Sequence, residues 1–432
     1  MKKNDGTIVI GAGISGMAAG MTNDWQIYEA NRIPGGICSS YFLKPYSSER
    51  LVERPLDEEV YMFEYGGGHW LFGSNSQVIN FLESLAPLSR YSRKSAVYYF
   101  EDNSVIPYPV QNNLRCFSEN TASRIYKDLI KAQSKPAKTM EKWLHQMFGP
   151  TLAGLFFIPF HELYTAGLHK RIAPDLAYKS PINIDLIKRG MFTKTELVGY
   201  NASFLYPDLG MNFLIGQMAK LCKITYSKRL VEVDIHKKIA KFSDGAEESY
   251  EKLITTISLK DMVKIAGISV KEKMSPYTSV LVVNVGGRRG HNCPKEHWLY
   301  IPKSKNGFYR IGFYSNVSQR FLPKSVRDND NYVSLYIEKS FVGGKKISEE
   351  EISRLCQLII EEIMSWGFLE HPEVIDHNWI EVAYTWLWSD DRWRKNTIEL
   401  LEKNQIYPLG RYAEWRFKGM IDSIGDGFRR RN

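Results

Sequence analysis

The sequence predicts an α/β fold in which a Rossmann-like nucleotide domain is interrupted by an inserted helical domain and an antiparallel β-sheet domain. Three observations predict it. Residues 7–29 contain an apolar run, a glycine-rich turn, a helix pattern and an acidic residue in that order. Residues 118–167 place apolar side chains at helical spacing, and residues 231–341 are rich in strand patterns. At 432 residues, the chain needs two or three hydrophobic cores.

The glycine-rich turn at the start organises the rest of the chain. The apolar run Thr7–Ile10 leads into Gly11, Gly13 and Gly16, the G-x-G-x-x-G positions. Gly11 permits a tight turn, Gly13 lets the backbone approach a pyrophosphate, and Gly16 lets the helix pack against the strand. The helix N-terminus adds free N–H groups and a positive dipole end. Glu29 follows where an acid binds ribose hydroxyls, so the pattern predicts a dinucleotide site.

A second glycine pair distinguishes between dinucleotides. Gly35 and Gly36 follow Glu29-Ala30 after four residues. This order is similar to the extended fingerprint of FAD-dependent oxidoreductases of the amine-oxidase-like class. We therefore predict non-covalent FAD as the cofactor.

Charge and cysteine content narrow the partners and the compartment. The net charge of +9 is spread along the chain, apart from Arg429–Arg431. It favours anionic small ligands or an anionic surface, although an ordinary solvated basic surface explains it equally well. No nucleic-acid motif accompanies it, so no nucleic acid is expected. Five widely spaced cysteines without a C-x-x-C pair indicate reduced thiols, no metal site and a cytoplasmic enzyme.

The ends and the hydropathy of the chain raise the question of membranes. The basic start followed by an apolar stretch imitates a secretory signal, but Asp5 interrupts it and the stretch is explained as the first strand. No run of about 18 apolar residues is present, so we expect no integral membrane span.

The patterns divide the chain into five segments. We expect the first part of the FAD domain at 1–115, the helical domain at 116–200, a return to the FAD domain at 201–270, the antiparallel sheet domain at 271–400 and a closing FAD-domain segment at 401–432.

Within these segments the elements are predicted in order. A polar insert at 47–59 reads as a surface loop, and 97–100 with 105–106 as a hairpin. An apolar strand at 253–257 precedes a helix. Further strands are expected at 280–285, 298–301, 309–313, 333–341 and 379–384, a helix at 349–366, and a short closing helix before Gly427.

A glycine run marks a second part of the cofactor site. Gly66, Gly67 and Gly68 let the backbone lie against a flat group, and His69 follows at once. A histidine in such a place is commonly a hydrogen-bonded structural residue. Beside a flavin fingerprint it is a candidate neighbour of the isoalloxazine ring. Asp422 and Ser423 of the closing segment are also assigned to the cofactor site.

Several uncommon short sequence motifs follow one another along nearly the whole chain. Besides the FAD fingerprint, they are Gly67-Gly68-His69, Pro107-Tyr108-Pro109-x-Gln111-Asn112-Asn113, Trp298-Leu299-Tyr300-x-Pro302 with Phe308-Tyr309-Arg310, Tyr314-Ser315-Asn316, and Gly410-Arg411-x-x-x-Trp415-Arg416. In them the chain resembles the eukaryotic-type branch of the UDP-galactopyranose mutases, within the amine-oxidase-like flavoproteins.

The resemblance implies a non-redox use of reduced flavin. In that family the enzyme interconverts pyranose and furanose forms of a nucleoside-diphosphate sugar, with N5 of the reduced flavin attacking the anomeric carbon and the diphosphate leaving. An external reductant such as NAD(P)H is also implied. A leaving diphosphate needs an anion clamp, which arginine forks and tyrosine hydroxyls provide.

The family's site residues map onto this chain. The histidine beside the flavin falls on His69, and the two diphosphate-binding pairs fall on Tyr300 with Arg310 and Tyr384 with Arg411. His69, Arg310 and Arg411 are thereby the expected catalytic residues. Each tyrosine could instead be a core aromatic and each arginine part of a structural ion pair. Further substrate-binding residues are expected at Tyr108, Gln111 and Asn112.

The departures from the family cluster at one end of the expected substrate. Val110 stands where the family has an aromatic that packs the base, His161 replaces an asparagine, and Thr165 approximately replaces a tryptophan. Phe417 replaces a tyrosine that reaches the diphosphate, and residues 385–395 lack the family's proline and Gly-Arg pattern. We therefore expect a substrate other than UDP-galactose.

Two other functions are compatible with the same residues. The chain could be a redox enzyme of the amine-oxidase-like class that oxidises a small molecule, or a flavin-binding subunit without catalysis. The sequence leaves the base, the sugar, the reductant and the oligomeric state open.

Overall fold

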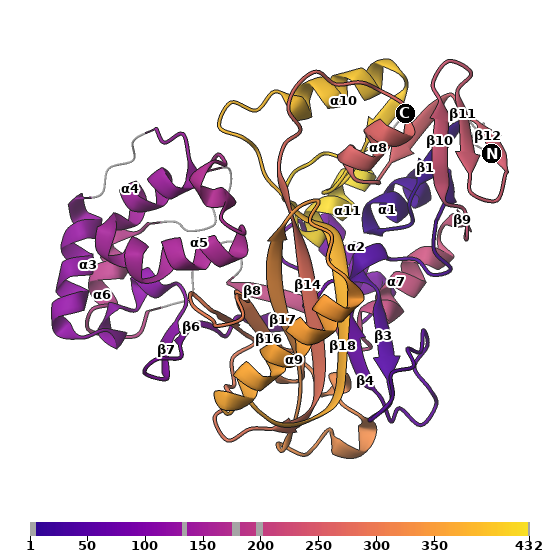
Figure 1. Ribbon diagram of the computed structural model, residues 1–432. Coiled ribbons are helices and arrows are strands. Elements are labelled where there is room, and N and C mark those ends of the chain that lie inside the picture. Colours follow the sequence, from indigo (N-terminus) through magenta and orange to yellow (C-terminus); the bar gives the residue numbers. More distant parts are fainter. Residues whose placement is uncertain (1–5, 132–135, 175–181, 196–201, 431–432) are drawn as a thin grey trace.

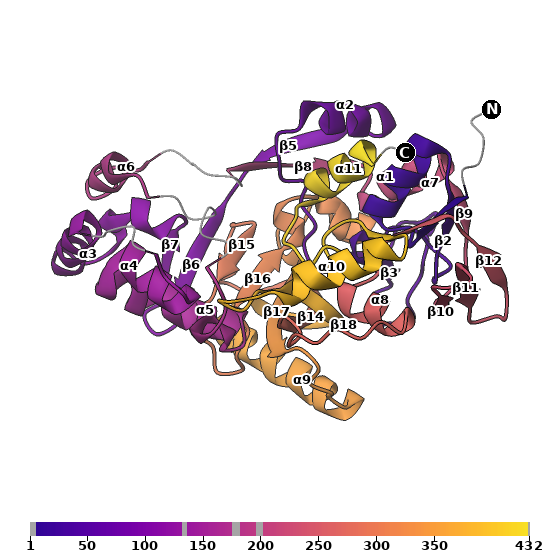
Figure 2. The ribbon, with the colours of Figure 1, turned by 90° about the horizontal axis from the view of Figure 1, so that it is seen from above.

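The computed structural model describes residues 6–131, 136–174, 182–195 and 202–430 (Figure 1). Three units are visible. A helical unit lies on the left of Figure 1, a large sheet stands in the centre, and a domain with a smaller sheet and its own helices lies at the upper right. The view from above places the central sheet between the other two units (Figure 2).

The domain at the upper right is built on a five-stranded parallel sheet. Its strand order is β19-β13-β1-β2-β9, and every neighbouring pair is parallel. The predicted first βαβ unit and the strand predicted at 253–257 are confirmed. After β2 the chain leaves this sheet, returns to it for β9 and β13, leaves again and returns for β19. The strands are β1 (Thr7–Ile10), β2 (Gln26–Tyr28), β9 (Lys223–Thr225), β13 (Lys252–Thr255) and β19 (Ile406–Pro408).

Helices cover this parallel sheet and tie the chain's two ends together. Helix α1 (Ile14–Asn23) packs against α11 (Met420–Arg429). A Cβ placed on Gly427 would lie 2.6 Å from the Ala18 Cβ, so small residues set the close approach. The other helices here are α2 (Ser76–Leu85), α7 (Met211–Lys220), α8 (Leu259–Ile265) and α10 (Trp393–Lys403). A three-stranded antiparallel sheet adjoins them, with β10 (Leu230–Asp234), β11 (Ile239–Phe242) and β12 (Glu247–Ser249).

The central unit is a seven-stranded sheet of order β18-β14-β17-β16-β15-β6-β7. It is antiparallel except for β15 and β6, which run parallel. Helix α9 (Glu349–Ser365) contributes Ile352, Ile359 and Ile363 to the core on one face. The strands are β6 (Ser95–Tyr99), β7 (Ser104–Pro107), β14 (Tyr277–Arg289), β15 (Trp298–Tyr300), β16 (Arg310–Phe313), β17 (Tyr332–Val342) and β18 (Leu369–Thr385).

The predicted hairpin is confirmed as β6 and β7. It lies in the seven-stranded sheet because β6 pairs with β15, with Ser95 opposite Trp298. The segment 1–115, predicted as the first part of the FAD domain, therefore includes two strands of this sheet. Two short antiparallel pairs link the units: β3 (Ser40–Leu43) with β4 (Tyr61–Glu64), and β5 (Leu88–Ser92) with β8 (Ser203–Pro207).

The helices of the helical unit share one apolar core with the edge of the seven-stranded sheet, where Val97 and Ile106 of the hairpin join it. Helix α4 is broken at Gly149, whose φ of +70° lies in the left-handed region, just before Pro150. A π-helical turn, η4 (Ala153–Phe157), then leads directly into the next helix. The helices are α3 (Glu119–Lys131), α4 (Met140–Leu152), α5 (Ile158–Tyr164) and α6 (Ile184–Arg189). Within the described ranges, no helix of the protein is long and apolar enough to cross a membrane.

Candidate functional site

Two adjoining cavities lie where the three units meet. The larger, of about 840 Å³, runs from the glycine-rich turn to the seven-stranded sheet. The smaller, of about 220 Å³, lies between the helical unit and the same sheet. Residues common to both walls show that the cavities are neighbours. They are Gly68, Trp70, Phe72, Arg310, Tyr384 and Phe417.

Two glycines of the fingerprint are required by backbone packing. Gly11 has a φ of +100°, and a Cβ there would overlap the Thr256 Oγ1. A Cβ on Gly16 would overlap the Gly11 carbonyl oxygen. Gly11 lines the larger cavity, whereas Gly16 lies behind it and brings α1 close to β1.

Gly13 faces open space. A Cβ placed on it would meet no atom within 4 Å, and one on Gly36 would meet only the Gly13 Cα, at 3.9 Å. The Gly35 N–H donates to the Ala12 carbonyl at 2.8 Å, which fixes the second glycine pair beside the first. Helix α1 begins here with no side-chain cap, so its first N–H groups face a cradle of glycine backbone. These residues fit the diphosphate of FAD.

Glu29 is held in place at the same end of the cavity. Its Oε2 accepts a hydrogen bond from the Ala12 N–H at 2.7 Å, and its Oε1 accepts one from the Asn31 N–H at 2.8 Å. The side chain is buried yet lines the larger cavity. Each carboxylate oxygen keeps a second lone pair, which a ribose hydroxyl can use.

The other predicted cofactor residues divide into two groups. Gly35, Gly36, Gly68 and Ser423 line the larger cavity. Gly67 and Asp422 are not among its lining residues. The Gly67 carbonyl accepts from His69, and the Asp422 carboxylate accepts from the Gly419 N–H at 3.2 Å at the start of α11. Of the glycine run, Gly66 and Gly68 line the cavity and Gly67 does not.

His69 lines the larger cavity beside this glycine run. Its Nδ1 donates to the Gly67 carbonyl at 2.8 Å, and its backbone N–H donates to Glu64 Oε2 at 2.6 Å. Burial works against the charged imidazolium, but the neighbouring Cys38 and Glu64 raise the pKa of His69 well above its usual value. The imidazole is therefore a fixed, proton-bearing group on the cavity wall.

Arg310 forms an ion pair with the buried carboxylate of Glu338 at the boundary between the cavities, and its own side chain is 24% exposed. Arg310 begins β16, and its Nη2 donates to Glu338 Oε1 on the neighbouring strand β17. The Tyr309 hydroxyl donates to the other carboxylate oxygen, and Glu338 is only 2% exposed. Burial opposes the charge on Arg310, yet Glu338 raises the pKa of Arg310 well above its usual value. The Arg310 guanidinium is therefore charged, and Glu338 fixes its orientation.

Arg411 reaches the larger cavity from a different sheet, just after β19. Its Nη2 donates to the Ala383 carbonyl at 2.8 Å. Its Cζ lies 4.6 Å from the centre of the Phe417 ring and 5.0 Å from that of Tyr384. Tyr384 lines both cavities, so the structure brings Arg310, Arg411 and Tyr384 together as predicted from the sequence.

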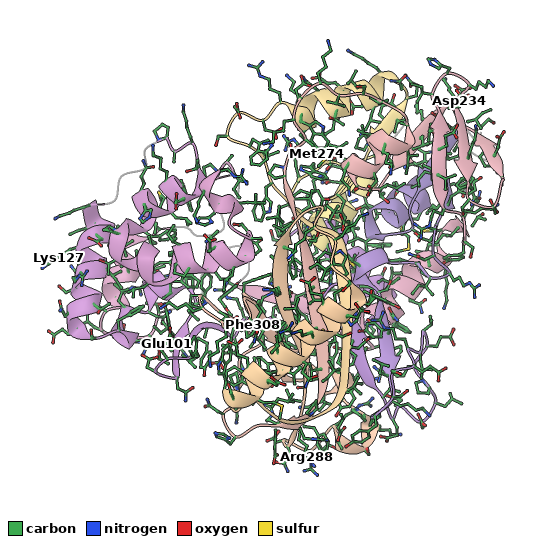
Figure 3. The ribbon with its side chains drawn as sticks, in the orientation of Figure 1. Glu101, Lys127, Asp234, Met274, Arg288 and Phe308 are labelled. Atoms are coloured by element: carbon green, nitrogen blue, oxygen red, sulfur yellow. The ribbon has the colours of Figure 1, made fainter. Side chains whose placement is uncertain are left out.

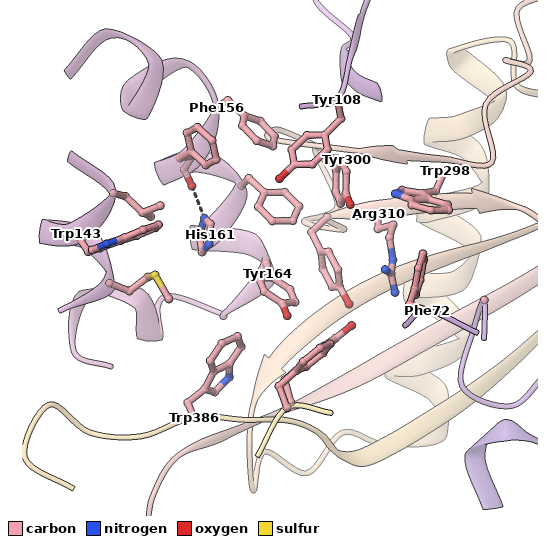
Figure 4. Close-up of a pocket in the computed structure, with 18 of the residues that line it drawn as sticks. Phe72, Tyr108, Trp143, Phe156, His161, Tyr164, Trp298, Tyr300, Arg310 and Trp386 are labelled. Carbon is pink, nitrogen blue, oxygen red and sulfur yellow. Dashed lines mark hydrogen bonds between the residues drawn. The ribbon is translucent and has the colours of Figure 1, made fainter. Parts of the chain in front are cut away.

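The smaller cavity is almost entirely aromatic (Figure 4). Tyr108 and Tyr300 line it side by side, with ring centroids 4.8 Å apart. The helical unit contributes residues that were not predicted as site residues, although the spacing of Phe156, Phe160 and Tyr164 gives them one helix face. The helical unit also contributes Trp143 of α4, and the opposite wall contributes Trp298, Tyr309 and Trp386 from the strands of the sheet or the residues beside them.

Several predicted substrate contacts lie elsewhere. Gln111 and Asn112 belong to a 3-10 turn, η2 (Val110–Asn112), and are buried away from both cavities. The Asn112 carbonyl accepts from the Thr195 hydroxyl at 3.1 Å. Thr165 ends α5, where its hydroxyl donates to the His161 carbonyl. His161 and Phe417 do line the smaller cavity.

The sequence predicts no metal site. In the portion of the chain that the structure describes, no three or more His, Cys, Asp or Glu side chains are grouped so as to hold a metal ion.

Comparisons with known proteins bear on the fold. No family model matches the sequence. Reduced UDP-galactopyranose mutase matches with a TM-score of 0.80 and 22% sequence identity, over 98% of this chain and 93% of that one. A putrescine oxidase redesigned in its cofactor binding matches at 0.57 and 12%, over 98% and 97%. A fatty acid isomerase from P. acnes matches at 0.58 and 12%, over 99% and 98%.

These likenesses establish the architecture. The predicted fold class, a Rossmann-like domain joined to a β-sheet domain with a helical insertion, is confirmed. At these identities the comparisons show the fold alone. Three different activities are named among the neighbours, so the chemistry of this chain has to be argued from its side chains.

Gly13→Val should abolish FAD binding, because the new side chain would fill the cradle in front of α1. Purified protein would lose the flavin absorption at 450 nm, which FAD-loaded protein shows. Gly216→Val is the matched control, since a Cβ there also meets nothing within 4 Å but lies in α7, outside both cavities. Stoichiometric flavin in Gly13→Val would show that the cradle is not the FAD site.

His69→Ala should keep FAD but change its reactivity. The His69 imidazole lines the larger cavity beside the glycine run, a position for tuning the flavin ring instead of anchoring the adenine end. We therefore expect the rate of turnover or of flavin reduction to change by about tenfold or more. His291→Ala, at an exposed position, is the control. A folded His69→Ala protein that has lost its FAD would contradict this role.

Proposed function

We propose that this chain is an FAD-dependent sugar-nucleotide mutase that interconverts pyranose and furanose forms of a nucleoside-diphosphate sugar other than UDP-galactose. The observation that carries the proposal is the position of Arg310 and Tyr384 at the junction of the two cavities, with Arg411 beside Tyr384 in the larger one. A sugar beside the flavin and a base in the aromatic cavity would be joined by a diphosphate at that junction.

The two arginines suit a diphosphate that gains charge as it leaves. Glu338 holds Arg310 through Nη2, and the buried Arg310 Nε has no hydrogen-bond partner among the residues that the structure describes. Within the same residues the Arg411 Nε is also unpaired, while Nη2 donates to the Ala383 carbonyl. N–H donors that are oriented before the reaction begins stabilise developing negative charge strongly. The Tyr384 hydroxyl adds a neutral donor.

The cofactor end supports the same assignment. Reduced FAD, when bound, supplies a nucleophilic nitrogen for the anomeric carbon of the sugar. Gly13 and Gly36 would lie along its diphosphate, Glu29 on its ribose, and His69 near its reactive part. The reduced state would come from an external reductant such as NAD(P)H. All five cysteines are free, and we place the reaction in the cytoplasm.

A redox function is the alternative. The aromatic lining of the smaller cavity would also suit a small apolar substrate of an amine-oxidase-like enzyme. Turnover of nucleotide sugars by dithionite-reduced enzyme without oxygen, and without net flavin oxidation, would support the mutase. Stoichiometric oxygen consumption with a small-molecule substrate would support the oxidase.

Replacing either arginine should weaken nucleotide binding and turnover together while FAD content stays intact. Each charged contact contributes about 1.5–3 kcal/mol, which is roughly tenfold to more than a hundredfold in affinity. Arg310→Lys and Arg411→Lys should be nearly as harmful as the alanine variants, because a point charge does not reproduce the guanidinium fork. Titration calorimetry with nucleoside diphosphates measures the loss.

A double variant and a control variant make this experiment specific. Arg310→Ala leaves Glu338 buried without its cation, so Arg310→Ala combined with Glu338→Gln separates lost binding from lost stability. Arg288→Ala is the matched control, because Figure 3 places Arg288 at the lower end of the central sheet, and it lines neither cavity. Unchanged affinity in both Arg310→Ala and Arg411→Ala would remove the mutase proposal.

UDP-galactopyranose should be a poor substrate, because Phe417 lines both cavities without a hydroxyl and its ring faces the Arg411 guanidinium. A hydrogen bond to a charged oxygen is worth about 1.5–3 kcal/mol, so Phe417→Tyr should raise kcat/KM for this sugar nucleotide by about tenfold or more. Phe213→Tyr, on the exposed side of α7, is the control. Turnover of UDP-galactopyranose by the unaltered protein as fast as that of any other sugar nucleotide would contradict the prediction.

A further inference from the structure

The outer end of the helical unit carries a concentrated positive charge. Helix α3 packs there against α6 and against a 3-10 turn, η3 (Leu114–Cys116). Figure 1 and Figure 2 both show α3 and α6 on the side of the unit that faces away from the central sheet. Residues 115–131 and 182–195 contain seven Lys or Arg and three Asp or Glu, a surplus of four positive charges in a chain whose net charge is +9.

Helix α3 arranges its cations in one row. Arg124, Lys127 and Lys131 follow one another at spacings of three and four residues, on the face opposite the buried Ile125 and Leu129. All three are exposed, and within the described ranges none of them forms an ion pair. Like charges three or four residues apart repel one another and weaken a helix. An external anionic partner would remove this repulsion.

The neighbouring elements extend this row of cations. The Arg115 N–H donates to the Gly190 carbonyl at 2.9 Å, which joins η3 to the end of α6. The Thr195 hydroxyl donates to the Asn112 carbonyl at 3.1 Å, so the residues after α6 stay beside the same turn. We call the resulting surface the basic face. Its exposed cations are Arg115, Arg124, Lys127, Lys131, Lys188 and Lys194.

Apolar side chains are exposed among these cations. Phe192 is 75% exposed, Ile130 of α3 is 50% exposed, and Ile184 at the start of α6 is 38% exposed. A surface that binds to a membrane interface combines the same two kinds of side chain. The apolar groups enter the boundary between headgroups and acyl chains, while Lys and Arg meet anionic headgroups. A nucleic-acid duplex would meet the cations but would offer little to the isoleucines.

We propose that the basic face binds the surface of a bilayer that contains anionic phospholipids. The bound protein would turn its helical unit toward the bilayer and its central sheet away from it. The cytoplasmic leaflet carries a negative surface potential, so the inference agrees with the cytoplasmic reaction proposed above. It does not depend on the reaction itself, because no residue of the basic face lines either cavity.

Sedimentation with vesicles tests the inference on the FAD-loaded protein. We expect binding to vesicles made of phosphatidylcholine and phosphatidylserine in equal amounts, and no binding to vesicles of phosphatidylcholine alone. Raising the ionic strength from about 0.1 M to about 1 M shortens the screening length from about 10 Å to about 3 Å. Most of the bound protein should then be released.

Replacing the α3 row should weaken this binding. The combined variant Arg124→Ala, Lys127→Ala and Lys131→Ala should bind phosphatidylserine vesicles about tenfold or more weakly, because each cation near an anionic surface contributes to the attraction. Alanine has the highest helix propensity, so α3 should stay helical. Circular dichroism and flavin absorption check that the variant is folded and loaded.

The matched control removes the same charges elsewhere. Lys345 and Lys346 in the turn after β17, and Arg354 on α9, are exposed and form no ion pair within the described ranges. Changing all three to alanine lowers the net charge by the same amount but leaves the basic face intact. This variant should bind the vesicles like the unaltered protein.

Phe192→Ser tests the apolar part of the face. It should weaken vesicle binding by about fivefold or more, because the serine side chain does not enter the acyl boundary. Leu56→Ser is the control, since Leu56 is fully exposed and lies outside the basic face.

Each remaining outcome would overturn the inference. Failure of the unaltered protein to bind phosphatidylserine vesicles, or equal binding to phosphatidylcholine alone, would remove it. Equal losses in the α3 variant and its control would show that net charge acts instead of this face. Tighter binding to a short DNA duplex than to vesicles, lost in the α3 variant, would assign the face to nucleic acid. Nucleoside-diphosphate binding enters none of these measurements, so the mutase proposal stands or fails separately.

Discussion

The ion pair between Arg310 and Glu338 lies where the larger cavity, the smaller cavity and the central sheet meet. A carboxylate that is 2% exposed is costly unless a cation and hydrogen bonds compensate it, and here Arg310 and the Tyr309 hydroxyl do so. Breaking such a pair by removing one partner typically costs about 3–5 kcal/mol. The same interaction that makes this part of the sheet stable therefore holds the guanidinium toward both cavities.

The arrangement of the parallel sheet brings the second arginine to the same place. Strand β19 comes from near the end of the sequence but lies in the sheet that β1 begins. Just after it, Gly410 packs so closely on Ser15 at the start of α1 that a Cβ would overlap the Ser15 Oγ. Arg411 follows directly, so the close contact between two distant glycine-rich turns positions its side chain beside the expected flavin.

The fold does not by itself fix the reaction, which depends on the side chains that line the two cavities. The same architecture occurs in a mutase, an oxidase and a fatty acid isomerase. In this chain a mostly aromatic cavity lies between the helical unit and the sheet, and the His161 Nδ1 on its wall donates to the Phe157 carbonyl.

The sequence by itself determined the parts of this protein that depend on local order. The first βαβ unit, its glycines and the hairpin predicted at 97–100 and 105–106 follow from period, turn residues and spacing, and the arginine and tyrosine pairs were recognisable by resemblance. The long strands were predicted only in part, as 280–285 of β14 (Tyr277–Arg289) and 379–384 of β18 (Leu369–Thr385). Only the tertiary structure decided which side chains face the cavities. Gln111, Asn112 and Asp422 are turned away by a 3-10 turn and a helix cap. Glu338, Tyr164 and Trp386 sit in apolar runs that read as core, and they meet because strand pairing and helix packing join segments more than a hundred residues apart.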